Sequence, residues 1–156
     1  MDHKQAKTLY DMIRNYLVFY KEFLEFETTK LDNVANNRMN LIDEHVKNEE
    51  VFLLKCRGFE VKREAFLKEC GMENMLMSEV ISTAPEDVRE PLESVFMELS
   101  ETLLDLREIN SRCNSMIEIR LHNIEKTINQ FEEHKQTQKN PTKGEKKFSD
   151  FISRKV

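Results

Sequence analysis

Histidine, carboxylate and cysteine side chains are the residues of this chain that could carry metal or acid–base chemistry. The histidines are His3, His45, His122 and His134, and a di-iron site in a helical bundle needs Glu-x-x-His repeats from different helices. The sequence has no such repeat, and most carboxylates alternate with basic residues in a pattern typical of a solvated helix face. We therefore predict no catalytic residue, no metal site and no cofactor.

The three cysteines and three glycines point the same way. Cys56, Cys70 and Cys113 are odd in number and widely spaced, which predicts reduced structural thiols and neither a disulfide framework nor a zinc site. The glycines form no phosphate-binding or dinucleotide-binding loop. A small all-helical enzyme whose Arg and Glu residues come from several helices stays open as an alternative.

The stretch from Pro91 to Phe131 predicts a different chemistry, the recognition of one helix by another. Its apolar residues recur in alternating steps of three and four, with a mean spacing of about 3.5 residues, as in a coiled-coil seam. A helix of this length spans about 60 Å and needs a partner of similar length. Asn110 lies in the predicted seam, where a polar residue commonly fixes register. The seam comprises Leu92, Phe96, Leu99, Leu103, Leu106, Asn110, Cys113, Ile117, Arg120, Ile124, Thr127 and Phe131, flanked by Val95, Ile109, Met116, Leu121 and Ile128.

The remaining sequence predicts the helices that position this stretch. Residues 7–26 are so rich in apolar side chains that they cover about 200° of a helix, enough to contact two neighbours, or one neighbour and a partner. One long helix is predicted over about residues 3–69, with a kink or break at 28–36 and a stop at Gly71. A short helix near Met75–Ile81 follows, and the last helix is predicted over about 91–133, with Pro91 in its first turn.

The fold class predicted is all-α: an elongated antiparallel helical bundle or coiled coil of about three long helices. The composition agrees, because 34% of the residues are charged and the chain has only three glycines and three prolines. We assign residues 1–134 to the bundle domain and residues 135–156 to a flexible basic tail. In that tail, Phe148, Phe151 and Ile152 recur at helical spacing and form a candidate docking segment.

The charge of the chain is unevenly distributed. The net charge is −5, and residues 135–156 carry seven Lys or Arg against two acidic residues, which leaves a charge of −10 on residues 1–134. An acidic body repels phosphates, so we predict no nucleic-acid partner. No apolar run approaches the ~18 residues of a membrane span, so we expect a cytoplasmic protein without stable membrane insertion.

Two segments resemble the FlgN-type flagellar export chaperones. The first contains Phe23-Leu24-Glu25-Phe26-Glu27 and continues through Phe59-Glu60-Val61-Lys62-Arg63-Glu64-Ala65-Phe66-Leu67 to Gly71. The second, Leu106-Arg107-Glu108-Ile109-Asn110-Ser111-Arg112-Cys113-Asn114-Ser115-Met116-Ile117, is similar to the family's Leu-x-x-hydrophobic-Asn-x-x-Asn-x-x-hydrophobic-Ile segment. The similarity covers about residues 9–131. Where the family often has its second Asn, this chain has Cys113, and Asn114 is displaced by one residue.

The resemblance implies a cytoplasmic, non-enzymatic chaperone that binds hook-filament junction proteins and keeps them soluble for type III secretion. It also makes the flagellar export gate a candidate partner. A gate contact through a tail aromatic residue would fall to Phe148 or Phe151, because all three tyrosines lie near the amino terminus.

We expect a helical segment of the client to bind the last helix and the tail, in the helix-in-groove manner. The residues expected to contact it are Asn110, Cys113, Asn114, Ile117, Leu121, Ile124, Ile128, Phe131, Phe148, Phe151 and Ile152. The alternative is a structural or scaffold coiled-coil protein that self-associates without a secreted client. A homodimer is left open under either interpretation.

Overall fold

The computed structural model describes residues 1–139 and contains four helices in that range and no strand. The helices are α1 (His3–Ala35), α2 (Met39–Glu69), α3 (Met77–Ser82) and α4 (Glu86–Lys139). The all-α prediction is confirmed, and the short α3 lies between the long helices α2 and α4 in the chain. The chain divides into two compact units, Met1–Cys113 and Asn114–Val156. The predicted division at residue 134 stays a prediction, and residues 140–156 of the predicted tail lie outside the described residues.

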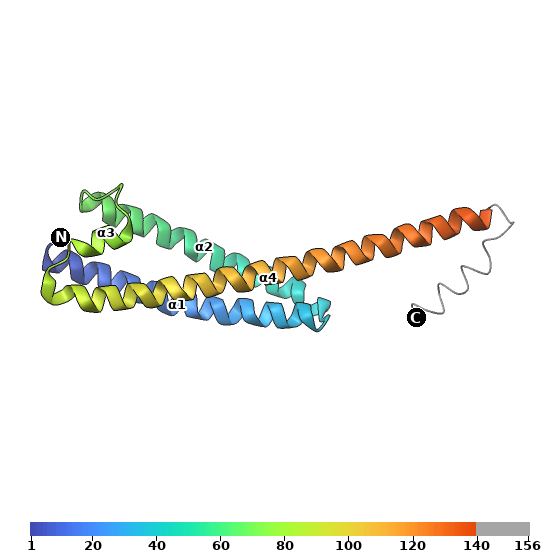
Figure 1. Cartoon of the computed structure of the whole chain (residues 1–156), viewed down its shortest axis with the longest axis horizontal. Coiled ribbons are helices and arrows are strands. Elements are labelled where there is room, and N and C mark those ends of the chain that lie inside the picture. Colours follow the sequence, from blue (N-terminus) through green and yellow to red (C-terminus); the bar gives the residue numbers. More distant parts are fainter. Residues whose placement is uncertain (140–156) are drawn as a thin grey trace. The chain divides into compact units, whose positions relative to one another are not determined.

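In unit 1 the chain reverses completely between α1 and α2, where the sequence predicted a kink or short break at 28–36 (Figure 1). The reversal occupies residues 36–38, and Asn37 has a φ of +58°, a left-handed conformation that asparagine tolerates better than most residues. Arg38 closes the turn, because its backbone N–H donates to the Asn33 carbonyl at 2.9 Å and its guanidinium pairs with Asp32 at 3.0 Å. Neither proline nor glycine is needed at this turn.

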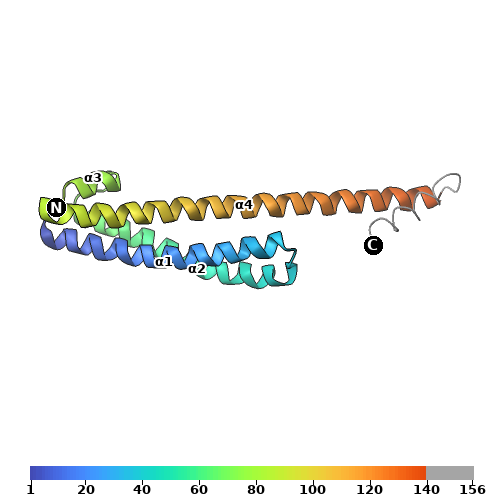
Figure 2. The same ribbon diagram turned by 60° about the horizontal axis from the view of Figure 1, so that its bottom comes forward.

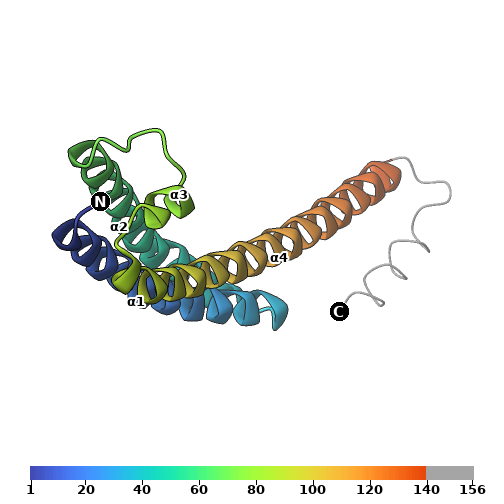
Figure 3. The same cartoon turned by 60° about the vertical axis from the view of Figure 1, so that its left-hand side comes forward.

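Gly71 ends α2 as predicted. It has a φ of +68°, and its N–H donates to the Lys68 carbonyl at 3.1 Å while the Met72 N–H donates to the Leu67 carbonyl at 2.8 Å. These two bonds form a Schellman motif, which requires the left-handed conformation that glycine adopts without steric cost. Beyond it, α3 lies near the end of α2 and the first turns of α4 (Figure 3).

The predicted start of the last helix at residue 91 is wrong. α4 begins at Glu86, so Pro91 lies inside the helix, beyond its first turn. The missing N–H of Pro91 removes one backbone bond there, but the turn before it is held by other contacts. The Arg89 side chain donates to the Ala84 carbonyl at 2.8 Å, and Asp87 pairs with His3 of α1 at 3.1 Å. α4 also extends to Lys139, past the predicted end at 133.

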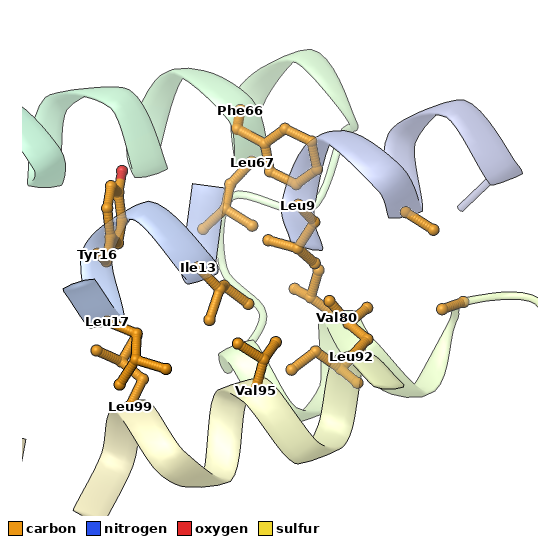
Figure 4. Packing of buried hydrophobic residues seen from close by; sticks show 13 residues of the cluster. Leu9, Ile13, Tyr16, Leu17, Phe66, Leu67, Val80, Leu92, Val95 and Leu99 are labelled. Atoms are coloured by element: carbon orange, nitrogen blue, oxygen red, sulfur yellow. The ribbon is translucent and has the colours of Figure 1, made fainter. Parts of the chain in front are cut away.

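The α1 helix packs between α2 and the first part of α4, which confirms that residues 7–26 contact two neighbours. α2 runs antiparallel to α1, and residues 86–113 of α4 run parallel to it (Figure 2). Leu9 and Ile13 of α1 extend into a core completed by Leu67 of α2 and by Val95 of α4 (Figure 4). The other core residues that Figure 4 labels are Tyr16, Leu17, Phe66, Val80, Leu92 and Leu99.

Aromatic rings line the α1–α2 interface further along. Tyr16 stacks on Phe59 with ring centroids 4.3 Å apart, and Phe23 stacks on Phe52 at 4.8 Å. The Tyr16 hydroxyl donates to the Phe59 carbonyl at 2.7 Å, so its polar end is satisfied inside the interface. Burial, followed by the nearby Glu60 carboxylate, raises the pKa of Tyr16. Aromatic pairs of this kind stabilise a helix–helix interface beyond the apolar area that they bury.

The stripe of α4 that packs in unit 1 follows one of the two rows of the predicted seam. On the other row, the more buried residue comes one position before the predicted one. Its buried or half-buried positions include Leu92, Val95, Leu99, Thr102, Leu106, Ile109 and Cys113, in steps of three and four, and the predicted seam residue Phe96 is half-buried against the same core. Asn110 is exposed, and Ile109 takes the inward position next to it. The placement of Asn110 in the intramolecular seam is therefore wrong, because either residue fits the sequence period but only the apolar one is favoured inside.

A candidate protein-binding surface on α4

The described part of unit 2 is helical throughout, from Asn114 to Lys139. Five apolar residues recur on it in steps of four and three, so they lie on one face of the helix. We call them the α4 stripe: Ile117, Leu121, Ile124, Ile128 and Phe131. Ile117 is half-buried, and the side chains of the other four are 39% to 54% exposed. The stripe has the spacing of a coiled-coil seam, and its side chains are accessible to solvent.

The α4 stripe is out of phase with the buried stripe of unit 1. The buried row Leu92, Leu99, Leu106 and Cys113 repeats every seven residues, and continuing that row predicts positions 120 and 127, which are Arg120 and Thr127. The apolar residues of the α4 stripe instead occur one position later in the seven-residue repeat. A shift of one position corresponds to about 100° of rotation around the helix axis. Residues 110 and 114 match this later phase, so Asn110 and Asn114 fall in register with the α4 stripe, and both are exposed.

Cys113 differs from the other predicted contact residues, because it is fully buried in unit 1. Burial raises the pKa of its thiol, and the nearby charged groups are Lys30, Glu27 and Glu49 of α1 and α2. The structure therefore places Cys113 in the core of unit 1. The predicted contacts Phe148, Phe151 and Ile152 lie outside the described residues.

A buried ionic cluster lies beside Cys113, and the sequence analysis missed it. Lys30 Nζ pairs with Glu49 Oε2 at 2.8 Å and with Glu27 Oε2 at 3.2 Å. Glu27 and Lys30 are 1% and 4% exposed, and the second oxygen of Glu27, Oε1, has no hydrogen-bond partner among the described residues. His45 is also buried near Glu27, and its Nε2–H donates to the Phe26 carbonyl at 2.8 Å. A signal existed in the sequence: positions 23, 27, 30 and 34 continue the buried heptad pattern of α1.

The pKa values of the cluster follow from burial and charge. Burial raises the pKa of Glu27, and the adjacent Lys30 ammonium only partly opposes the effect. For Lys30, burial lowers the pKa, but the hydrogen bond to Glu49 and the two carboxylates more than offset it, so the net shift is upward. Lys30 is therefore a charged group held inside the protein by two carboxylates.

Two charged groups at an apolar groove of unit 1 satisfy each other. This groove of about 170 Å³ is lined by Met12, Ile13, Tyr16, Tyr20, Phe59, Glu60, Arg63, Met77, Phe96, Leu99 and Leu103. Arg63 Nε donates to Glu60 Oε2 at 2.9 Å. That hydrogen bond lowers the pKa of Glu60, with burial opposing the shift. Within residues 1–139, no three His, Cys, Asp or Glu side chains are grouped so that they could hold a metal ion.

None of the described helices is both long enough and apolar enough to cross a membrane.

Comparison with known families identifies the family of the chain. The chain matches the family described as FlgN protein over residues 1–144. It belongs to the FlgN family. This FlgN chain is thus a member of a family of flagellar export chaperones, as the resemblance in the sequence indicated. No curated protein and no solved structure matches it. The exposed stripe of this FlgN chain is consistent with a chaperone, which must present apolar surface to its clients.

The thiols of this FlgN chain should differ in reactivity. Burial raises the pKa of Cys56, Cys70 and Cys113, so little reactive thiolate is present at neutral pH. Cys113 is fully buried, whereas Cys56 and Cys70 are half-buried. We expect iodoacetamide to modify Cys56 and Cys70 slowly in the native protein and Cys113 only in urea, as measured by peptide mass spectrometry. Native modification of Cys113 at the rate of Cys70 would contradict its assignment to the core.

Proposed function

We propose that this FlgN-family protein is a cytoplasmic, non-enzymatic chaperone that binds the hook-filament junction proteins and keeps them soluble until they are exported. The observation that carries the proposal is the exposed α4 stripe, which has the 3.5-residue period of a helix–helix seam. A helical segment of the client lies along Ile117, Leu121, Ile124, Ile128 and Phe131 and buries them in the helix-in-groove manner. The family membership supports a flagellar substrate.

The polar residues in register with the stripe set the position of the client helix. Asn110 and Asn114 are exposed one turn apart, at the amino-terminal end of the stripe. Amides in an otherwise apolar seam favour a single register, because any other register buries them without a partner. The tail residues Phe148, Phe151 and Ile152 add a second contact, either to the client or to the export gate.

Titration calorimetry with purified hook-filament junction proteins tests this proposal. We expect saturable binding of one client per chain, and we expect the chaperone to suppress client aggregation measured by light scattering. The absence of binding to all hook-filament junction proteins at about 100 μM, far above the concentration of a functional complex, would contradict the proposal.

The second candidate function is a self-associating scaffold, favoured by the same coiled-coil period. In that case a second copy covers the α4 stripe. Sedimentation equilibrium separates the two: a tight homodimer that does not dissociate when hook-filament junction protein is added favours the scaffold, and a monomer, or a dimer displaced by the client, favours the chaperone.

A further inference from the structure

The α2 helix is apolar on two opposite faces, and within residues 1–139 only one of them is covered. Its inner face packs on α1 through Ile42, His45, Phe52, Phe59 and Phe66. On the opposite side, residues 51, 54, 58, 61 and 65 recur in steps of three and four, which places them along one line of the helix. We call this line the α2 outer face: Val51, Leu54, Gly58, Val61 and Ala65. All five are exposed, and Val51, Leu54 and Val61 are 56% to 69% exposed.

Gly58 lies at the centre of this face, and no packing contact in the described part of the chain requires a glycine there. A Cβ built at Gly58 meets no atom within 4 Å, and its φ is not positive. Neither packing nor backbone conformation therefore requires glycine, although glycine destabilises a helix interior relative to alanine. A missing side chain does allow another helix to approach the backbone closely, since the distance between packed helices is set by the residues at the contact.

The edges of the α2 outer face are basic. Five cations, Lys47, Lys55, Arg57, Lys62 and Lys68, lie on or beside it with three carboxylates, Glu50, Glu64 and Glu69. The other carboxylates of this part of α2 are engaged elsewhere, Glu49 with Lys30 and Glu60 with Arg63. Lys55 also lies over the Phe19 ring, 5.8 Å from Nζ to the ring centroid. A basic edge is notable because residues 1–134 as a whole are strongly acidic.

The charge pattern disfavours a second copy of this chain as the occupant. In an antiparallel pair centred on Gly58, the flanking rows bring Lys55 of one copy beside Lys62 of the other and Glu50 beside Glu64, so like charges meet along both edges. A parallel pair matches Glu50 with Lys55, but it also brings Arg57 beside Lys62 and Glu64 beside Glu69. Like charges at such positions oppose association.

We propose that the α2 outer face is a second docking surface, which takes an amphipathic helix of another protein with small or apolar residues in its seam and Asp or Glu along its edges. The seam of that helix packs over Gly58 between Leu54 and Val61, and its carboxylates pair with Lys62 and the other cations. The surface belongs to unit 1, shares no residue with the α4 stripe, and does not depend on which client binds that stripe.

Two synthetic helical peptides of about 20 residues test this proposal. They share an Ala/Leu seam and differ only in having Glu or Lys at the edge positions, and their binding to the full chain is measured by fluorescence anisotropy. We expect the Glu peptide to bind at least about tenfold more tightly than the Lys peptide, with the difference shrinking as salt is added. Equal binding of both peptides would overturn the proposal.

Three variants locate the site. We expect Leu54→Glu and Lys62→Glu each to weaken binding of the Glu peptide about tenfold, whereas Leu104→Glu, an equally exposed leucine on α4, leaves it unchanged. Gly58→Ala should raise the thermal unfolding midpoint and yet weaken binding of the Glu peptide. A glycine with a purely structural role would not give this combination. If Gly58→Ala and Leu54→Glu both bind the Glu peptide with the affinity of the wild type, the site is refuted. If the wild-type protein is a dimer and Leu54→Glu abolishes that dimer, the occupant is a second copy of the chain.

Discussion

Replacing Leu121 and Ile128 together by glutamate is expected to weaken binding of the hook-filament junction proteins by about 100-fold, or about 2.7 kcal/mol. Both side chains are about half exposed in the α4 stripe, so in the free protein the new carboxylates remain hydrated. In the complex they would be buried in an apolar seam, where an unpaired charge is strongly unfavourable. Titration calorimetry with the purified client measures the loss.

The same helix offers a matched control. Ile119 is 62% exposed and lies two residues from Ile117, about 200° around the helix from it. We expect Ile119→Glu to change client affinity by less than about twofold and Leu121→Glu alone to weaken it about tenfold. All three variants should keep the thermal unfolding midpoint of the wild type, because no buried residue changes. Equal losses for Ile119→Glu and Leu121→Glu would show that the stripe is not the binding face.

Replacing Lys30 by alanine is expected to destabilise the protein by about 3 to 5 kcal/mol, because it leaves two carboxylates without their cation in the interior. Glu27 is almost completely buried, and Glu49 Oε2 lies 2.8 Å from the Lys30 nitrogen. Without the ammonium group, the pKa of Glu27 should rise further, since burial already raises it. Urea unfolding followed by circular dichroism measures the free-energy difference.

An exposed ion pair between the same two residue types provides the control. Lys21 pairs with Glu98, and both side chains are 52% exposed. We expect Lys21→Ala to change stability by no more than about 1 kcal/mol, as for most exposed pairs. The double variant Glu27→Gln/Lys30→Met should recover part of the loss, because it removes both charges of the most buried pair. A Lys30→Ala variant as stable as Lys21→Ala would contradict a structural role for the cluster.

The periodicity of the chain was sufficient to predict that it is helical and that residues 7–26 pack on two neighbours. The all-α class, the dense contacts of residues 7–26 and the stop at Gly71 follow from local rules, since apolar spacing and glycine conformation act within a few residues. Family membership could also be anticipated from two helical segments. The sequence could not predict the complete reversal at residues 36–38, because an asparagine in the left-handed conformation leaves a weaker signal than glycine or proline.

Which face of each helix is covered was decided by the tertiary structure. A period of 3.5 residues fits adjacent registers equally well, so Ile109 and Asn110 were both acceptable in the seam until α1 and α2 supplied the partner surface. The same limit concealed Glu27 and Lys30, which are charged residues at core positions and become favourable inside only because Glu49 of another helix completes the cluster.

The sequence by itself determined that this protein is helical, indicated its family, and showed an apolar periodicity that continues to Phe131. Only the tertiary structure decided that Cys113 is the last buried residue of that seam in unit 1, that the stripe beyond it is exposed, and that α2 presents a second apolar face. The physical reason is that periodicity is a property of one helix, whereas burial depends on contacts between residues far apart in the chain.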